Sequence, residues 1–411
     1  MSIPALSRPA DGSVFAYAVE SLGPRLLVTH PCDRFVYVAN WESDSISGFR
    51  IDVEHGNLTP IPGSPAQTGR HPRGITVHPS GASVYVSNWD SNSISAYSVD
   101  LESGRLTPAA GSPYPAGVNP RNIRLDPQGT FGYVANRGSN DISVFRVEGP
   151  TGRLESLPSS PVASGRRPRS MMLDPTGRFA FTAHERTRVL SSYRVAPVTG
   201  DLAALEGSPF RTGRDPRFVT VDPTGRFAVV ANQKSNDVSA YAIDEAQAGL
   251  VAAPGSPFRA GQRPFQVVVT PTGRFAYVAN QRSNSVSGYR IDPVTGALSD
   301  VRGSPAYAGK HPIFPTFDPA GRFLYVANRE SANVSAFSID DQTGELRPVP
   351  GSPFPAGTRP RAIIVTRSGE WAFLANEGSD DVSGYRCDPE DGSLTPVPGS
   401  PFPAGRIQGS S

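Results

Sequence analysis

One short run in the middle of the chain gathers the residue types that acid–base catalysis needs. Residues 184–188 read His-Glu-Arg-Thr-Arg, so an acid, a possible base and two cations lie within five positions. A carboxylate or an imidazole can transfer a proton, and arginine can bind an anion. The run predicts acid–base chemistry on an anionic ester, with Glu185 and His184 handling protons and Arg186 binding substrate. The alternative is a decayed copy of a repeated loop.

The run interrupts a repeat with a period of 48 residues. The tetrapeptide Tyr-Val-Ala-Asn at 37–40 returns, with variations, at 85–88, 133–136, 181–184, 229–232, 277–280, 325–328 and 373–376. Gly63-Ser64-Pro65 recurs at the same step, up to Gly399-Ser400-Pro401. A fixed period of this length indicates a repeat architecture.

Each repeat predicts four antiparallel strands. In residues 264–311, a β-branched run (266–270), the tetrapeptide strand (275–280) and an alternating strand (286–291) are separated by turns rich in Pro, Gly and Asn. A weaker, more polar strand (297–301) follows. This pattern is typical of a β-propeller blade.

The chain is therefore predicted to be all-β, a β-propeller of eight four-stranded blades. The blades begin at Pro24, Pro72, Pro120, Pro168, Pro216, Pro264, Pro312 and Pro360. We expect residues 24–411 to form this single domain. Residues 1–23 form an N-terminal arm, in which 13–20 resemble a third strand and are predicted to close the ring at the edge of the last blade.

The amino-acid composition indicates which classes of partner the chain is not expected to bind. Lys and Arg number 39 against 37 Asp and Glu, and a net charge of +2 favours neither nucleic acid nor a membrane surface. Residues 1–10 have no basic start or apolar core, so we expect no signal peptide and a cytoplasmic location. We also expect the protein to be a monomer. We interpret Cys32 and Cys387 as reduced thiols, the alternative being a disulfide across the ring seam.

The repeat serves as an internal control, because a residue present in every blade is most simply structural. The serine of the third strand occurs in all eight blades, at 47, 95, 143, 191, 239, 287, 335 and 383, and is predicted to bond to nearby backbone. Arginine follows the opening proline in six blades, at 25, 73, 121, 169, 217 and 361. These arginines predict a basic site near the axis that attracts anions; the alternative is ion pairing between blades.

Two positions break the symmetry. After the tetrapeptide the blades carry Trp41, Trp89, Arg137, Glu185, Gln233, Gln281, Arg329 and Glu377 in turn. Two residues after the opening proline they carry Leu26, Gly74, Asn122, Ser170, Phe218, Gln266, Phe314 and Ala362. We expect both sets to line the channel mouth. Trp41 and Trp89 are candidates for a platform that stacks on a sugar or aromatic ring, or else they cover the seam between the first two blades.

The tetrapeptide, the third strand, the Thr-Gly or Ser-Gly turn and Gly-Ser-Pro-Phe together resemble the β-propeller lactonase family. This family includes propeller-type 6-phosphogluconolactonases, muconate-lactonising enzymes and proteins with YVTN repeats. The resemblance covers nearly the whole chain, although family members usually have seven blades, which is the alternative to eight here.

The resemblance implies an active site at the channel mouth, where inner strands begin and second strands end. Family lactonases have Pro-Arg-His at the first place and Asn-Glu at the second; histidine and glutamate transfer protons and arginine binds the acidic substrate. Here Pro168-Arg169 accompanies His184-Glu185, and Pro360-Arg361 accompanies Asn376-Glu377. No blade has His after Pro-Arg. Arg169, Arg217, Arg361 and Glu377 are the predicted substrate-binding residues.

Two functions follow from these residues. One is a lactonase-like hydrolase of a sugar-acid or related lactone. The other is a non-catalytic propeller that binds a small anion, a carbohydrate or a protein partner. The sequence has no phosphate loop, dinucleotide fingerprint or metal-ligand spacing, so neither function is expected to use a cofactor or a metal.

Overall fold

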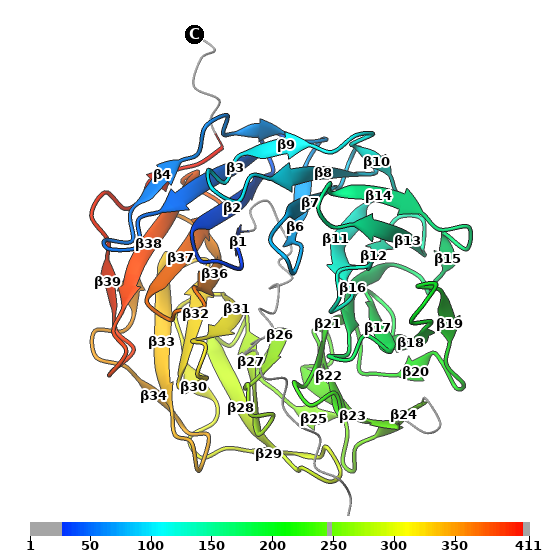
Figure 1. Ribbon diagram of the computed structural model, residues 1–411. Helices are drawn as coiled ribbons and strands as arrows, with labels where there is room; N and C mark the ends of the chain where they lie inside the picture. The colour runs from blue at the N-terminus through cyan, green and yellow to red at the C-terminus, as the bar shows by residue number, and fades with distance from the viewer. Residues whose placement is uncertain (1–26, 245–248, 406–411) are drawn as a thin grey trace, which may run out of the picture.

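The computed structural model describes residues 27–244 and 249–405, and every regular element in these ranges is a β-strand. Eight sheets stand side by side around a central axis, and the first and last lie next to each other (Figure 1). The structure is an eight-bladed β-propeller. The prediction of eight blades is confirmed, and the seven-bladed alternative is wrong.

The strands repeat in the same order in each blade. The inner strands are β1 (Leu27–Thr29), β6 (Pro72–Val77), β11 (Pro120–Leu125), β16 (Pro168–Leu173), β21 (Pro216–Val221), β26 (Pro264–Val269), β31 (Pro312–Phe317) and β36 (Pro360–Val365). The second strands are β2 (Phe35–Asn40), β7 (Ser83–Asn88), β12 (Phe131–Asn136), β17 (Phe179–His184), β22 (Phe227–Asn232), β27 (Phe275–Asn280), β32 (Phe323–Asn328) and β37 (Trp371–Asn376). The third are β3 (Ser45–Ile51), β8 (Ser93–Val99), β13 (Asp141–Glu148), β18 (Val189–Val195), β23 (Asp237–Asp244), β28 (Ser285–Ile291), β33 (Asn333–Ile339) and β38 (Asp381–Cys387).

The outer edge of each blade is made by two shorter strands that both pair with the third strand. The fourth strands are β4 (Leu58–Pro60), β9 (Leu106–Pro108), β14 (Arg153–Ser156), β19 (Leu202–Ala204), β24 (Gly249–Ala252), β29 (Leu298–Asp300), β34 (Leu346–Pro348) and β39 (Leu394–Pro396). A two-residue fifth strand follows in each blade, namely β5 (Ala66–Gln67), β10 (Tyr114–Pro115), β15 (Val162–Ala163), β20 (Phe210–Arg211), β25 (Phe258–Arg259), β30 (Ala306–Tyr307), β35 (Phe354–Pro355) and β40 (Phe402–Pro403).

The tetrapeptide strand forms the core because a blade is covered on both faces by its neighbours. All six residues of every second strand are buried. The tyrosine of the motif also joins blades: the Tyr37 hydroxyl donates to the Gly104 carbonyl of the next blade at 2.8 Å, and Tyr277 bonds Gly344 in the same way. A buried phenol needs such a partner, which explains why tyrosine suits this position.

The ring closes by packing of the last blade on the first. Trp371 of β37 and Phe373 belong to the same apolar cluster as Phe35 of β2. The Ser368 backbone N–H donates to Asp33 at 2.8 Å across this seam. The whole predicted arm, residues 1–23, with its ring-closing strand at 13–20, lies outside the described residues.

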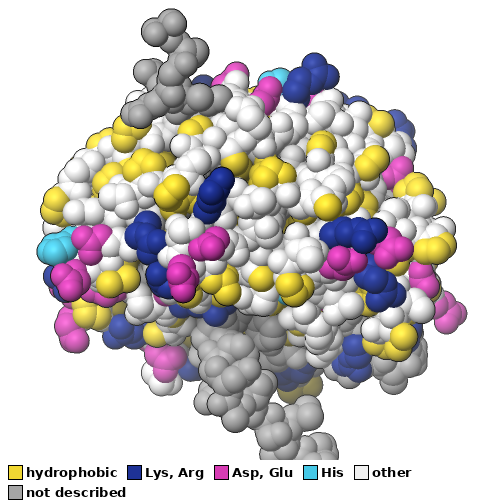
Figure 2. All heavy atoms as spheres, turned by 45° about the horizontal axis from the view of Figure 1, so that its top comes forward, with side chains coloured by type: hydrophobic (Ala, Val, Ile, Leu, Met, Phe, Trp, Pro, Cys, Tyr) yellow, Lys and Arg dark blue, Asp and Glu magenta, His cyan; other side chains and the backbone are white. Residues whose placement is uncertain are grey.

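Both cysteines are free thiols, as the sequence analysis expected, and burial raises the pKa of Cys387 to about 12. Figure 2 shows acidic and basic side chains interspersed over the outer surface in view, with single hydrophobic side chains between them. Ion pairs such as Arg274–Asp341, at 3.1 Å, account for part of this mixture. No helix in the described ranges is long and apolar enough to cross a membrane.

Replacing the tryptophan at the seam tests ring closure. Trp371 is 4% exposed, and Trp371→Ala is expected to lower the free energy of unfolding by about 3–5 kcal/mol because it leaves a cavity between the last and first blades. Denaturant unfolding measures the loss. Val198→Ala, at a side chain that is 79% exposed, is the control and should change stability by less than about 0.5 kcal/mol. Equal unfolding midpoints for the two variants would contradict this account of the seam.

Candidate functional site

A cluster of arginines gathers where the inner strands begin, at one end of the ring. In most blades the register of the inner and second strands shifts just after the opening proline: Pro168 pairs with His184, but Ser170 already pairs with Ala183. Arg169 is therefore the extra residue of a β-bulge. A bulge re-aims a side chain out of the sheet. The same shift occurs around Arg73, Arg217 and Arg361.

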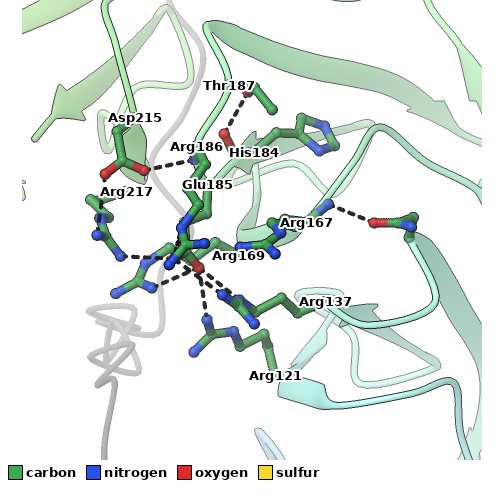
Figure 3. A network of polar contacts seen from close by, with 11 residues as sticks. Arg121, Arg137, Arg167, Arg169, His184, Glu185, Arg186, Thr187, Asp215 and Arg217 are labelled. Carbon is green, nitrogen blue, oxygen red and sulfur yellow. Dashed lines mark hydrogen bonds and ion pairs between the residues drawn. The ribbon is translucent and has the colours of Figure 1, made fainter. Parts of the chain in front are cut away.

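Glu185 lies at the centre of this cluster, 5% exposed (Figure 3). Its Oε2 accepts hydrogen bonds from Arg137 Nε at 2.7 Å and Arg169 Nη1 at 3.2 Å. Arg121 Nη2 is 3.5 Å from Oε2, and Arg217 Nη1 is 3.5 Å from Oε1. Four guanidinium groups from three blades thus surround one carboxylate.

The charge state of Glu185 follows from this geometry. Burial alone raises the pKa of its carboxyl, but the hydrogen bond from Arg137 and the charges of Arg169 and Arg217 outweigh burial and hold the pKa well below the usual range. Glu185 is therefore a carboxylate at neutral pH. It can accept a proton but cannot serve as a general acid in its resting state.

A second, smaller group surrounds Glu377 in the last blade. Arg329 Nη2 and Arg361 Nη1 are each 3.1 Å from its Oε2, and Arg359 Nη2 is 3.4 Å from Oε1. Burial lowers the pKa of Arg361 to about 10, although Glu377 acts in the opposite direction. The two groups together contain more guanidinium groups than carboxylates, so the site as a whole favours a further anion.

The two tryptophans of the first blades contact cations and not each other. The Trp89 ring has the guanidinium carbons of Arg73, Arg121 and Arg137 at 4.4, 4.8 and 5.7 Å from its centroid. Trp41 stacks on His71, with ring centroids 4.5 Å apart and planes 17° apart. Arg73 contacts both rings, since its guanidinium carbon is also 5.7 Å from the centroid of the Trp41 ring. At the place where a sugar or aromatic ring was predicted to stack on Trp41 and Trp89, the structure therefore has an arginine.

Three phenylalanines bound the site on the side of blades five to seven. Phe218, Phe265 and Phe314 contact one another with centroids 5.2–5.9 Å apart, and all three are buried. Arg169 lies 5.9 Å from the Phe265 ring. An apolar boundary of this kind strengthens charge interactions beside it, because little water screens them.

The whole described propeller matches the family described as "Lactonase, 7-bladed beta-propeller", over residues 23–119, 110–214, 208–256, 249–356 and 317–406. The chain belongs to this lactonase family. No curated protein is similar enough in sequence to match.

Solved structures agree on the fold. A putative 6-phosphogluconolactonase from Bacteroides fragilis is 19% identical, with 95% of this chain and 97% of that chain covered and a TM-score of 0.60. The periplasmic gluconolactonase PpgL of Pseudomonas aeruginosa is 21% identical, with 92% and 97% covered and a TM-score of 0.58. Sqt1 from Chaetomium thermophilum, at 13% identity with 89% and 94% covered, has a TM-score of 0.63. At these identities the likeness shows the fold alone.

His184 occupies a structural position in this lactonase-family propeller. In the other seven blades an asparagine amide donates to the serine seven residues later, as Asn40 does to Ser47 at 2.9 Å. His184 Nε2 takes that place, 2.8 Å from Ser191 Oγ. Its ring is buried and turned away from the arginines around Glu185 (Figure 3). A catalytic role for His184 stays a prediction that this geometry does not favour.

The serines themselves are structural, as predicted. Their hydroxyls accept the asparagine amide and a backbone N–H of the loop before the blade, for example Gly69 to Ser95 at 3.2 Å. Arg186 is at the rim: its side chain is 60% exposed and 3.8 Å from Glu185, while its backbone N–H donates to Asp215 at 2.7 Å. Among the described residues no group of His, Cys, Asp and Glu could hold a metal.

The predicted substrate-binding set omitted Arg73, Arg121, Arg137 and Arg329, which all lie in the site. A signal for two of them was present in the sequence. Arg137 precedes Glu185 by one repeat, and Arg329 precedes Glu377 by one repeat; both pairs are hydrogen-bonded. The same position pairs Gln233 with Gln281 at 3.0 Å. Complementary residues one period apart therefore predict contacts between neighbouring blades.

His184 gives the protein a specific sensitivity to acid. Burial lowers its pKa to about 4, so the folded protein keeps it neutral while the unfolded chain protonates it below pH 6.5. The stabilisation is present above pH 6.5 and is lost as the pH falls toward 4. His184→Asn restores the amide of the other blades, and between pH 7 and 4 it should gain about 3 kcal/mol of unfolding free energy relative to the parent.

Chemical denaturation at the two pH values measures this difference. Asn376→His, which places a histidine at the same position of the last blade, is the matched converse and should make the protein more sensitive to acid. If the parent and His184→Asn differ equally at both pH values, burial does not hold His184 neutral.

Proposed function

We propose that this protein is a lactonase-like hydrolase that opens an anionic sugar-acid or related lactone at the arginine cluster around Glu185. The observation that carries the proposal is the excess of guanidinium groups over carboxylates at the axis, three of them, on Arg121, Arg169 and Arg361, being buried. Four arginines surround Glu185 and three more surround Glu377, whereas Asp215 is the one further carboxylate paired with them among the described residues. Membership of the lactonase family supplies the reaction class.

The arginines suit two tasks in this reaction. Arg169, Arg217 and Arg361 can bind the acidic group of the substrate by charge-assisted hydrogen bonds. Neighbouring guanidinium groups can also stabilise the negative charge that develops on the lactone carbonyl oxygen when water attacks. A site with fixed cations and an apolar boundary needs little reorganisation to do so.

Glu185 is the proposed proton acceptor. A water molecule attacks the carbonyl carbon and gives a proton to the Glu185 carboxylate; the bond from that carbon to the ring oxygen breaks, and the proton passes to the leaving alkoxide. The product is a hydroxy acid. Because the arginines lower the pKa of Glu185, it is a weak base, and electrostatic stabilisation by the cluster must supply most of the rate enhancement.

A second candidate is a non-catalytic propeller that binds a small anion, a carbohydrate or a protein partner. It is favoured by one observation: both oxygens of Glu185 already lie within ion-pair distance of guanidinium groups. A carboxylate held in this way neutralises the cluster and leaves the remaining cations for a ligand.

Lactone hydrolysis assays separate the two candidates. The parent is expected to hydrolyse at least one member of a panel of sugar-acid and muconate lactones. Glu185→Gln should lower kcat by about 100-fold or more, because the amide cannot accept the proton. Glu148→Gln, at an exposed acid on the edge of the third blade, should leave kcat unchanged.

Thermal melting of each variant shows whether the fold is kept, since Glu185→Gln removes a negative charge from among arginines. Absence of turnover by the folded parent across the panel would reject the hydrolase. Saturable binding of a lactone or its acid without turnover would then support the second candidate.

A further inference from the structure

Arg73 differs from its counterparts in the other blades. Arg121, Arg169 and Arg217 lie within ion-pair distance of Glu185, and Arg361 lies within that distance of Glu377. Arg73 forms no ion pair with any described residue. Its Nε is buried without a hydrogen-bond partner among the described residues, as are the Nε atoms of Arg169, Arg217 and Arg361, so the missing ion pair is what distinguishes Arg73. The second blade therefore brings to the site a cation that no described residue neutralises by an ion pair.

The backbone places Arg73 beside a second arginine. Gly74 lets β6 approach β11 closely: a Cβ at Gly74 would lie 2.5 Å from Asn122 Oδ1 and 2.7 Å from Asn122 Cα. Arg73 and Arg121, which precede these two residues, consequently contact the same indole, with 4.4 and 4.8 Å from their guanidinium carbons to the Trp89 centroid. Glycine at this position brings two cations together.

The surroundings of Arg73 oppose its charge. Burial lowers its pKa well below the usual value, and the charges of Arg169, Arg361 and Arg137 act in the same direction. Contacts with Trp41 and Trp89 offset part of this cost, because the aromatic faces attract the cation. A half-buried cation that forms no ion pair with the described residues gains from an anion delivered by a ligand.

The indole rings of Trp41 and Trp89 also restrict the direction from which an anion can reach Arg73. Cation–π contact places an aromatic ring against a guanidinium group and leaves N–H donors that point outward in the guanidinium plane. A carboxylate or a phosphate accepts two such N–H groups side by side. This geometry selects an oxyanion that approaches the edge of the guanidinium group.

We propose that Arg73, held against Trp41 and Trp89 and assisted by Arg121, is the subsite that recognises the anionic group of the ligand. The inference deepens the proposed function and rests on it for the position of the ligand at the axis. The subsite adds to Arg169, Arg217 and Arg361, which are also proposed to bind the acidic group. Arg73 is then a residue that determines specificity for charged over neutral lactones.

Tryptophan fluorescence tests the subsite directly. The chain has three tryptophans; two contact Arg73, and Trp371 lies at the seam between the last and first blades. Inorganic phosphate and succinate are the probes, one for each kind of oxyanion. The parent should show a saturable fluorescence change with at least one of them, and the probe that binds more tightly identifies the preferred group.

Two substitutions distinguish recognition from a structural role. Arg73→Gln should raise the Kd by at least about tenfold, and Arg73→Lys, which keeps the charge but loses the paired donors, should give an intermediate Kd. Without a probe, Arg73→Gln should melt no lower than the parent, because it relieves repulsion. Arg282→Gln removes the same charge at an exposed loop and should leave the Kd unchanged.

A Kd for Arg73→Gln within twofold of the parent value would overturn the subsite, and so would a parent without saturable binding of either probe. The measurement needs no turnover, so it stands apart from the hydrolysis assay. Binding that depends on Arg73 without lactone hydrolysis would reject the hydrolase alone. Hydrolysis of a charged lactone with a KM unaffected by Arg73→Gln would reject the subsite alone.

Discussion

The structure depends on the burial of eight equivalent strands between blades. Each second strand is covered on both faces, so its apolar side chains have no contact with water, and in four of these strands the motif tyrosine bonds to the turn of the next blade. No blade could bury these residues by itself. Ring closure covers the apolar face of the last blade with the first blade, through Trp371 and the apolar cluster around it. The same packing brings the start of every inner strand to one end of the axis.

Because the inner strands begin at the same end of the axis, the arginines that follow their opening prolines gather there as one cluster. An arginine after the opening proline is bulged out of its strand, and bulges from neighbouring blades direct their guanidinium groups toward shared carboxylates. Glu185 and Glu377 each gather arginines from their own blade and from a neighbouring one. The repeat thus places arginines at equivalent positions in several blades. Glu185 and Glu377, which depart from the repeat, form the ion pairs with them.

The arginines at the axis outnumber the carboxylates that pair with them, and this excess of positive charge connects the fold to the proposed function. Buried cations beside one another are costly, and a protein keeps them where a ligand completes the balance. The phenylalanines on one side and the tryptophans on the other limit water near the charges. This excess of positive charge is the reason that an oxyanion, either on a substrate or formed during a reaction, is proposed to bind here.

The amino-acid sequence by itself predicted the architecture, because an unbroken period of 48 residues with four strand patterns in each copy is typical of propeller blades, but closure of the ring was decided by the tertiary structure. It also placed Glu185, Arg169, Arg217 and Arg361 where second strands end and inner strands begin, while their roles toward a substrate stay predictions. The bulges, which depend on strand register, were visible only in the tertiary structure. So were the role of His184 as a replacement for asparagine and the lack of an ion pair between Arg73 and any described carboxylate. These features arise from contacts between blades, and the sequence of one blade does not say which charges its neighbours bring within reach.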